Sequence, residues 1–126
     1  MAERKNKILV VDDEPDIVFT IQKILENEGY EVITANDGKA ALEKLKTVRA
    51  DLILLDVMMP GVDGWNVCKI LKEHEKTKSI PIAILTGLSK DIDKLTSLDL
   101  ALADRHINKP VDKEDLIKTV KLLLKN

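Results

Sequence analysis

Unbroken apolar runs alternate along the chain with stretches in which apolar residues recur at helical spacing. Four aliphatic residues in a row occupy 8–11, 52–55 and 82–85. Runs of this kind are typical of strands that are buried on both faces of a parallel sheet. Segment 31–35 alternates only in part, as a strand nearer a sheet edge does, and 106–108 is short. The pattern therefore predicts five strands.

Five amphipathic segments follow the predicted strands, and each is expected to form a helix with one apolar face. Pro15 suits the first position of a helix, and Gly29 is placed to end it. Asp37 can cap the second helix, and Asp115 resembles the acidic partner of a capping box in the last. The predicted helices start at or near Pro15, Asp37, Gly64, Asp91 and Asp112. The residues expected to face inward are Ile17, Ile21, Ile24, Leu25, Ala41, Leu42, Leu45, Val67, Ile70, Leu71, Ile92, Leu95, Leu98, Leu102, Leu116, Val120, Leu123 and Leu124.

Five repeats of a strand followed by a helix imply parallel pairing with right-handed crossovers and helices on both faces of the sheet. We therefore expect a doubly wound α/β domain of the flavodoxin-like kind, with five strands in the order 2-1-3-4-5. No linker, repeat or low-complexity segment interrupts the pattern, so residues 1–126 are predicted to form a single domain with no output domain.

Composition narrows the choice of partners and compartment. Lys and Arg number 20 against 22 Asp and Glu, which leaves no basic field for a nucleic acid, so no direct nucleic-acid binding is expected. Cys68 is the single cysteine, which excludes an intrachain disulfide, and its apolar setting predicts a core residue. No apolar run reaches membrane-spanning length and no signal-peptide core is present, so we predict a cytoplasmic protein without membrane contact.

Polar residues stand directly after the apolar strands, where sites of open parallel sheets form. Asp12 and Asp13 follow the first strand and Asp56 follows the third, while Thr86 and Lys109 follow the fourth and fifth. Single aspartates at such places often serve as caps, as we expect for the aspartates at 37, 63 and 112. Five polar residues at successive strand ends instead predict one shared site.

This set of side chains is suited to phosphoryl transfer. Three carboxylates held close together repel one another, and a hard divalent cation such as Mg²⁺, which prefers oxygen ligands, relieves that repulsion. Lys109 supplies a positive charge that can pair with a carboxylate or a phosphate, and Thr86 supplies a hydroxyl donor. Together they predict a site that stabilises negative charge on a transferred phosphoryl group.

Several blocks resemble the receiver domain of two-component response regulators, in particular the single-domain chemotaxis-regulator kind. The matching blocks, which span nearly the whole chain, are 8–15, 52–61, 63–64, 85–86 and 109–110. The resemblance implies a signalling switch and not an enzyme with an independent substrate. It also implies a sensor histidine kinase or phosphotransfer protein as donor, and a downstream partner on the face of the fourth helix, fifth strand and fifth helix.

The resemblance assigns roles to the predicted site residues. Asp56 is the implied phosphoacceptor, and Asp12, Asp13 and Asp56 are implied to hold Mg²⁺ with the backbone carbonyl of Met58. Thr86 is implied to move to the phosphoryl group, and Lys109 to form a salt bridge with it. The bond from Lys109 to the following proline is predicted to be cis, since X-Pro bonds adopt that geometry at low cost.

One position departs from the family pattern. His106 stands where receivers usually carry Tyr or Phe, a ring that turns inward in the activated state. We hypothesise that His106 takes this switch role and that its protonation opposes the inward position, because an imidazolium resists burial. The alternative is a partly exposed strand residue without a switching role.

Other functions remain to be weighed against a phosphorylation-controlled switch. A phosphorelay intermediate that passes the group from Asp56 to a histidine phosphotransfer domain fits the sequence equally well. A phosphatase of the haloacid-dehalogenase kind needs a second aspartate where Met58 stands, and a flavodoxin needs a phosphate loop that is missing. A degenerate scaffold is disfavoured because all five site residues are present.

Overall fold

The computed structural model describes residues 5–56, 64–86 and 104–124 of the 126-residue chain. The predicted fourth helix at 91–101 lies outside these residues, and the other four predicted helices and all five predicted strands are present. The elements are β1 (Lys7–Val11), α1 (Pro15–Asn27), β2 (Glu31–Ala35), α2 (Gly38–Leu45), β3 (Leu52–Asp56), α3 (Gly64–Glu73), β4 (Ile82–Thr86), β5 (Arg105–Asn108) and α6 (Lys113–Leu124).

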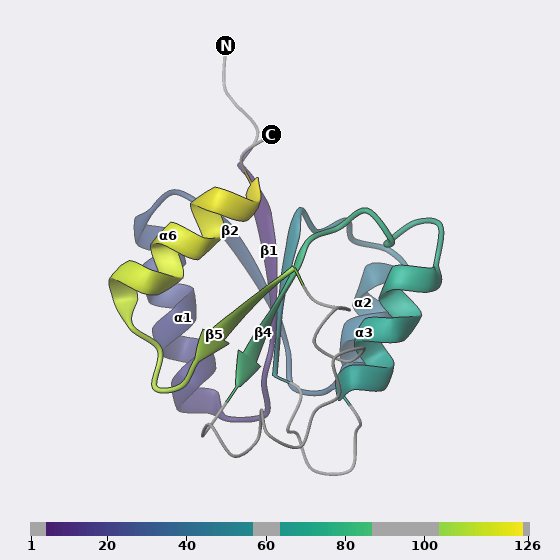
Figure 1. Cartoon of the computed structure of the whole chain (residues 1–126), viewed down its shortest axis with the longest axis horizontal. Helices are drawn as coiled ribbons and strands as arrows, with labels where there is room; N and C mark the ends of the chain where they lie inside the picture. The colour runs from purple at the N-terminus through teal and green to yellow at the C-terminus, as the bar shows by residue number, and fades with distance from the viewer. Residues whose placement is uncertain (1–4, 57–63, 87–103, 125–126) are drawn as a thin grey trace.

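The five strands form one parallel sheet in the order β2-β1-β3-β4-β5, which confirms the predicted α/β fold. Val10 of β1 lies in register with Thr34 of β2 on one side and Leu54 of β3 on the other. The partly alternating strand β2 is at one edge, as its pattern predicted, and β5 is at the other. Every neighbouring pair of strands is parallel, so their carboxyl ends share one edge of the sheet, to which the arrowheads of β4 and β5 point in Figure 1.

The sheet separates two apolar layers, with α1 and α6 on one face and α2 and α3 on the other (Figure 1). Successive strand residues point to opposite faces. Thus Leu9 of β1 packs in the layer with Cys68 and Leu71 of α3, while its neighbour Val10 packs with Leu25 of α1. Both faces are covered, which explains why the central strands are apolar at every position.

Local signals in the sequence set the helix ends. Pro15 is the first residue of α1, and Gly29, after that helix, has a φ of 92°, a conformation that glycine adopts without strain. The Asp37 side chain caps α2 by accepting a hydrogen bond from the Ala40 amide at 2.7 Å. The side chain of the aspartate before α6 likewise accepts from the amide of Asp115 at 2.9 Å.

The inward faces of the helices are mostly those predicted, with exceptions near the helix edges. Ile70 was expected to face inward, but its side chain is 39% exposed, because Cys68 and Leu71 take the buried stripe of α3. Leu123 and Leu124, near the end of α6, are only partly buried. Cys68 is fully buried as predicted, and burial raises the pKa of its thiol to about 11.

Two carboxylates tie the amino ends of the strands together. Asp51, just before β3, accepts a hydrogen bond from the amide of Lys7 in β1 at 2.8 Å. Asp104, just before β5, accepts from the amide of Ile82 in β4 at 2.8 Å and from Lys72 of α3 at 3.0 Å. These bonds join the starting points of neighbouring strands.

Among the helices of the described residues, none combines the length and the apolar character that crossing a bilayer requires.

Candidate functional site

The predicted site lies where β1 and β3 end side by side. Val11 and Leu55 are paired residues near the ends of these neighbouring strands. Asp12 follows Val11 directly, and its amide donates to the carbonyl of Ala35 at 3.2 Å, which anchors it to the end of β2. Asp56 is the last residue of β3. The register of the sheet therefore brings two aspartates that are 44 positions apart in the chain to one edge.

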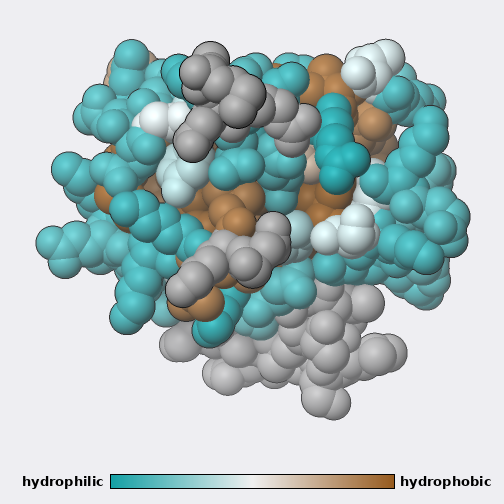
Figure 2. All heavy atoms as spheres, turned by 90° about the horizontal axis from the view of Figure 1, so that it is seen from above, coloured by the Kyte–Doolittle hydropathy of each residue, from teal (hydrophilic) through white to brown (hydrophobic). Residues whose placement is uncertain are grey.

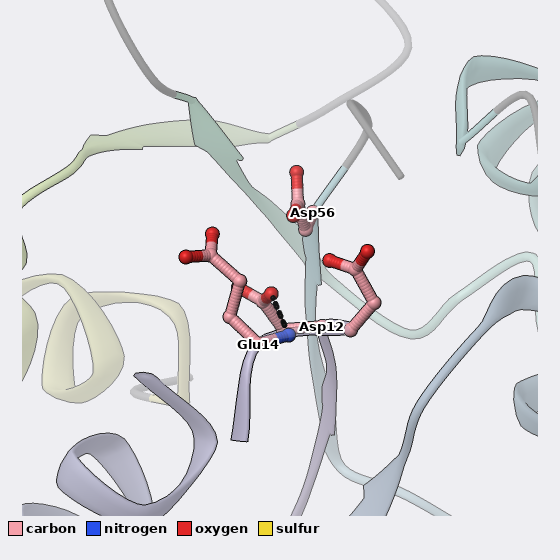
Figure 3. A group of neighbouring side chains, drawn as sticks. Asp12, Glu14 and Asp56 are labelled. Atoms are coloured by element: carbon pink, nitrogen blue, oxygen red, sulfur yellow. Dashed lines mark hydrogen bonds between the residues drawn. The ribbon is translucent and has the colours of Figure 1, made fainter. Parts of the chain in front are cut away.

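Four carboxylates gather at this edge. Asp12, Asp13, Glu14 and Asp56 each offer one oxygen atom, and these atoms lie within 4.8 Å of one another. Asp12 and Asp56 are buried, whereas Asp13 and Glu14 are exposed. Figure 3 shows Asp12 and Glu14 after β1, with Asp56 standing at the end of neighbouring β3. We refer to this group as the acid pocket.

Glu14 was not predicted as a site residue, although it directly follows the predicted aspartate pair. Its amide donates to Oδ1 of Asp12 at 3.0 Å, the bond drawn in Figure 3, which orients that carboxylate. Its own carboxylate reaches Lys109 at 3.1 Å. The signal that could have found it is the run of three acidic residues after the first strand.

Lys109 brings a positive charge into the acid pocket. Its Nζ lies 2.8 Å from Oδ2 of Asp12 and 3.0 Å from Oδ2 of Asp56, in addition to its contact with Glu14. The lysine side chain is 13% exposed, so these contacts are largely shielded from water. The bond between Lys109 and Pro110 is cis, as predicted. The structure thus joins the end of β5 to the ends of β1 and β3.

Burial and charge act against each other in this pocket. Burial raises the pKa of Asp12 above its usual value, and the nearby Asp56 charge adds to the rise, whereas Lys109 and the Glu14 amide reduce it. Burial alone would lower the pKa of Lys109, but the close negative charges of Asp12 and Asp56 outweigh burial, and the net shift is upward. The ammonium is therefore firmly charged while the carboxylates around it crowd one another.

Oδ2 of Asp12 shows that the pocket has capacity for a further cation. This buried atom lies 2.8 Å from Lys109, close enough for an ion pair, yet no donor among the described residues meets it with hydrogen-bond geometry. Within the part of the chain that the structure describes, the Lys109 ammonium meets three carboxylates of the acid pocket, so negative charge exceeds positive charge among these residues. Hard oxygen donors in excess of positive charge suit Mg²⁺. The residues of the acid pocket therefore fit a divalent cation.

The other predicted site residues are placed less completely. Thr86 is the last residue of β4 and lies in register with Asn108, so its backbone ends at the same edge as the acid pocket. Met58 lies outside the described residues. His106 is on β5 beside Ile84, its side chain is exposed, and partial burial lowers the pKa of its imidazole.

A hollow of about 260 Å³ opens beside the acid pocket, between α1 and the end of β2. Asp12 and Asp13 line it together with Phe19 of α1. The Phe19 ring is 61% exposed, and Nζ of Lys23 lies 5.4 Å from its centre. The approach to the carboxylates thus passes an exposed aromatic side chain.

Residues 8–121 match the model of the response regulator receiver domain. The chain belongs to this family. Receiver domains are signalling switches of two-component systems, and the match covers every element that builds the acid pocket. The family assignment agrees with the resemblance found in the sequence.

Characterised relatives resemble this receiver domain over about half of their own length. The transcriptional regulatory protein PhoP for alkaline phosphatase synthesis in Bacillus subtilis is 45% identical over 94% of this chain and 48% of its own. The response regulator ArlR of Staphylococcus saprophyticus is 40% identical, over 94% of this chain and 52% of its own. The receiver domain therefore spans about half the length of the regulators it matches.

Solved receiver structures match it along the entire fold. The chemotaxis response regulator CheY4 of Vibrio cholerae is 34% identical with a TM-score of 0.86, covering 96% of this chain and 100% of that one. The response regulator TrrA of Thermotoga maritima, solved in complex with Mg²⁺ and beryllofluoride, is 37% identical with a TM-score of 0.83. That match covers 94% of this chain and 99% of TrrA.

Proposed function

We propose that this receiver domain accepts a phosphoryl group on Asp56 and changes conformation in response. One observation carries the proposal. At the carboxyl edge of the sheet, Nζ of Lys109 lies 2.8 Å from a carboxylate oxygen of Asp12 and 3.0 Å from one of Asp56. Asp56 is the central member, since it is buried, ends the central strand β3 and bonds the ammonium.

The transfer step is a displacement at phosphorus. A carboxylate oxygen of Asp56 forms a bond to phosphorus as the bond from phosphorus to the donor's imidazole nitrogen breaks, and the imidazole keeps the electron pair. Lys109 stays charged and pairs with the oxygens of the incoming group in place of a carboxylate. The domain also assists the later hydrolysis, in which water bonds to phosphorus as the bond from phosphorus to the Asp56 oxygen breaks, so that inorganic phosphate leaves and the carboxylate is restored. No separate substrate is turned over.

Asp12, Asp13 and Asp56 are proposed to hold Mg²⁺, together with the backbone carbonyl of Met58. The support is the excess of carboxylate over ammonium charge in the acid pocket and the presence of Mg²⁺ in the complex of the related TrrA. Bound there, Mg²⁺ supplies positive charge that stabilises the transferred phosphoryl oxygens. Asp13 is exposed, which gives the cation a route from solvent.

The proposed switch runs along β4 and β5. Thr86 at the end of β4 is proposed to move toward the phosphoryl oxygens and donate a hydrogen bond. His106, on the neighbouring strand, is proposed to turn inward behind it, more readily when neutral than when protonated. Activation by a phosphoryl mimic that is equal above and below the imidazole pKa would contradict the role of His106.

The proposed donor is a histidine kinase or a phosphotransfer protein. We propose that it docks over α1, because the exposed ring of Phe19 borders the hollow that leads to Asp12 and Asp13. The signal is proposed to leave by the face of β5 and α6, and the fourth helix that the resemblance adds to this face lies outside the described residues. Relatives of twice the length are named as transcriptional regulators, so a DNA-binding partner or companion domain is the proposed recipient.

Intact-protein mass spectrometry after incubation with acetyl phosphate and Mg²⁺ tests the proposal. We expect one phosphoryl adduct on the wild type, none on Asp56→Asn, and none when Mg²⁺ is chelated. Asp51→Asn is the matched control, since it changes an aspartate at the other end of the same strand, and it should retain the adduct. An adduct that persists in Asp56→Asn, or no adduct on the wild type, would contradict the proposal.

A further inference from the structure

A groove crosses the ends of α2 and α3, at the edge of the sheet opposite the acid pocket. Its first hollow has a volume of about 320 Å³, and four of its lining side chains are aliphatic, namely Leu42, Leu45, Ile70 and Leu71. Ile70 is the residue that the helix pattern predicted to be inward but that is 39% exposed. Figure 2 looks onto the end of the molecule where α2 and α3 finish and shows apolar side chains among hydrophilic ones there.

The groove is longer than a single hollow. A second hollow of about 420 Å³ shares Leu45, Lys46, Lys76 and Thr77 with the first and continues toward the segment between α2 and β3. An open, elongated trough of this kind fits an extended or helical stretch of polypeptide better than a compact small molecule, which an enclosed cavity would bury.

The floor of the groove is held in place by hydrogen bonds. The Thr77 hydroxyl is buried and donates to the carbonyl of Leu71 at 2.6 Å, close to the end of α3. The amide of Thr77 donates to the carbonyl of His74, and the amide of Ile80 donates to the carbonyl of Thr77. The groove is therefore formed before any partner arrives, which lowers the entropic cost of binding.

The charge around the groove is positive in a protein that is negative as a whole. Segments 37–51 and 69–80 carry eight Lys and Arg against five Asp and Glu, a net +3, whereas the whole chain is −2. Lys46 and Lys76 line the first hollow, and among its described lining residues none is acidic.

Nearby acids do not cancel this charge. Glu43 pairs with Lys46 at 3.2 Å, and Glu75, which lines the second hollow, pairs with Lys78 at 3.0 Å, but all four side chains are more than half exposed. Exposed pairs of this kind contribute little free energy, so an incoming carboxylate can displace them. The groove thus has an aliphatic floor and a mainly basic lining, which complement apolar side chains and carboxylates.

We propose that this groove binds an acidic segment of a partner protein that carries apolar side chains. Apolar residues of the segment pack on Leu42, Leu45 and Ile70, and its carboxylates face Lys46 and Lys76. Because the groove lies at the amino edge of the sheet, its occupant leaves the acid pocket and the α1 hollow open. The interaction is thus a second docking site that does not depend on the proposed phosphorylation.

Selection from a library of displayed random peptides against the full chain tests the proposal. We expect the recovered peptides to combine Asp or Glu with large apolar residues. A recovered peptide, synthesised with a fluorophore, should bind Ile70→Gln and the double variant Lys46→Glu/Lys76→Glu about tenfold more weakly than wild type in fluorescence anisotropy. Binding should also weaken as salt rises, since the lysines are exposed.

Matched controls lie on the other face of the molecule. Leu122→Gln and Lys118→Glu change an exposed leucine and an exposed lysine of α6, and both should leave peptide binding unchanged. Circular dichroism of every variant checks the fold. The proposal is overturned if no recovered peptide depends on Ile70, if the recovered peptides are neutral or basic, or if the α6 variants lose binding equally.

Discussion

The two edges of the sheet use the same residue type in opposite ways. At the amino edge, Asp51 and Asp104 accept hydrogen bonds at 2.8 Å from backbone amides of neighbouring strands. At the carboxyl edge, Asp12 and Asp56 face each other and share one ammonium, that of Lys109. An aspartate that bonds a strand amide joins that strand to its neighbour, whereas aspartates that bond the same lysine repel each other.

This difference separates stability from function within one fold. A carboxylate bound to a partly buried amide stabilises the folded state, because the amide would otherwise lose a partner. Carboxylates crowded without enough positive charge destabilise the folded state and are retained where a ligand needs them. The amino edge is therefore expected to respond to mutation through unfolding, and the carboxyl edge through ligand binding.

The largest expected effect is the loss of stabilisation by Mg²⁺. A cation that binds only the folded protein raises its stability by about 2.7 kcal/mol when its concentration is about a hundredfold above Kd. We expect Mg²⁺ to raise the thermal midpoint of the wild type and of Asp51→Asn, and to leave that of Asp12→Asn unchanged. Differential scanning fluorimetry with and without chelator measures this. If Mg²⁺ raised the thermal midpoint of Asp12→Asn as much as that of the wild type, the proposed difference between the two edges would be contradicted.

A smaller effect on stability is expected from removing a side chain that hydrogen-bonds neighbouring strands at the amino edge. Asp104→Ala removes the acceptor for the Ile82 amide and for Lys72, and should lower the free energy of unfolding by about 1 to 2 kcal/mol. Asp13→Ala removes an exposed carboxylate at the other edge and should change it by no more than about 0.5 kcal/mol. Urea denaturation in the presence of chelator gives both values. Equal losses would mean that neither edge is specialised.

A neutral residue at position 12 is expected to raise the free energy of unfolding, whereas the substitution at the amino edge lowers it. Because the folded-state pKa of Asp12 is raised, the charged form is disfavoured by folding, and Asp12→Asn should raise the urea midpoint in metal-free buffer at neutral pH. The stability that protonated Asp12 contributes is present below the usual carboxyl pKa and is lost as pH rises through the raised pKa. The advantage of Asp12→Asn should therefore shrink as pH falls toward about 4. A variant less stable than wild type at neutral pH contradicts this sign.

Sequence reasoning was most successful where a residue's role follows from its position along an element. The five strands follow from periodicity, the Asp37 cap from the capping preference of aspartate, and the convergence of Asp12, Asp56 and Lys109 from parallel strands that end at one edge. The strand order follows from the flavodoxin-like kind of fold that the strand and helix repeats indicate. It was less successful where several elements decide together. Ile70 has helical spacing from the core stripe, but Cys68 and Leu71 occupy the buried face of α3 and leave Ile70 39% exposed.

Glu14 illustrates the second limit in the site itself. Its acidity is visible in the sequence, but whether its side chain meets Lys109 depends on two segments that are 95 positions apart. The structural roles of Asp51 and Asp104 were missed for the same reason, since each depends on the amide of a neighbouring strand. Pairwise geometry between distant segments is what periodicity does not encode.

The smallest expected effect concerns His106, on the strand that leads to Lys109. Partial burial lowers the pKa of its imidazole, so its ring should titrate below about 6.5 in a nuclear magnetic resonance pH series. A lowered histidine pKa contributes stability that is present above the usual value and is lost as pH falls through the folded-state pKa. Since the side chain is exposed, this loss should be slight, and it should be absent in His106→Gln.

The same titration connects His106 to the carboxyl edge. If the ring turns inward when the acid pocket carries a phosphoryl mimic, deeper burial should lower the pKa of His106 further once Mg²⁺ and beryllofluoride are added. Asp56→Asn removes the proposed acceptor and should abolish that second shift, while Asp51→Asn should retain it. A His106 pKa that stays unchanged on adding the mimic to wild type would mean that the ring keeps its exposed position. The conformational change caused by the mimic would then involve Thr86 and Lys109 but not His106.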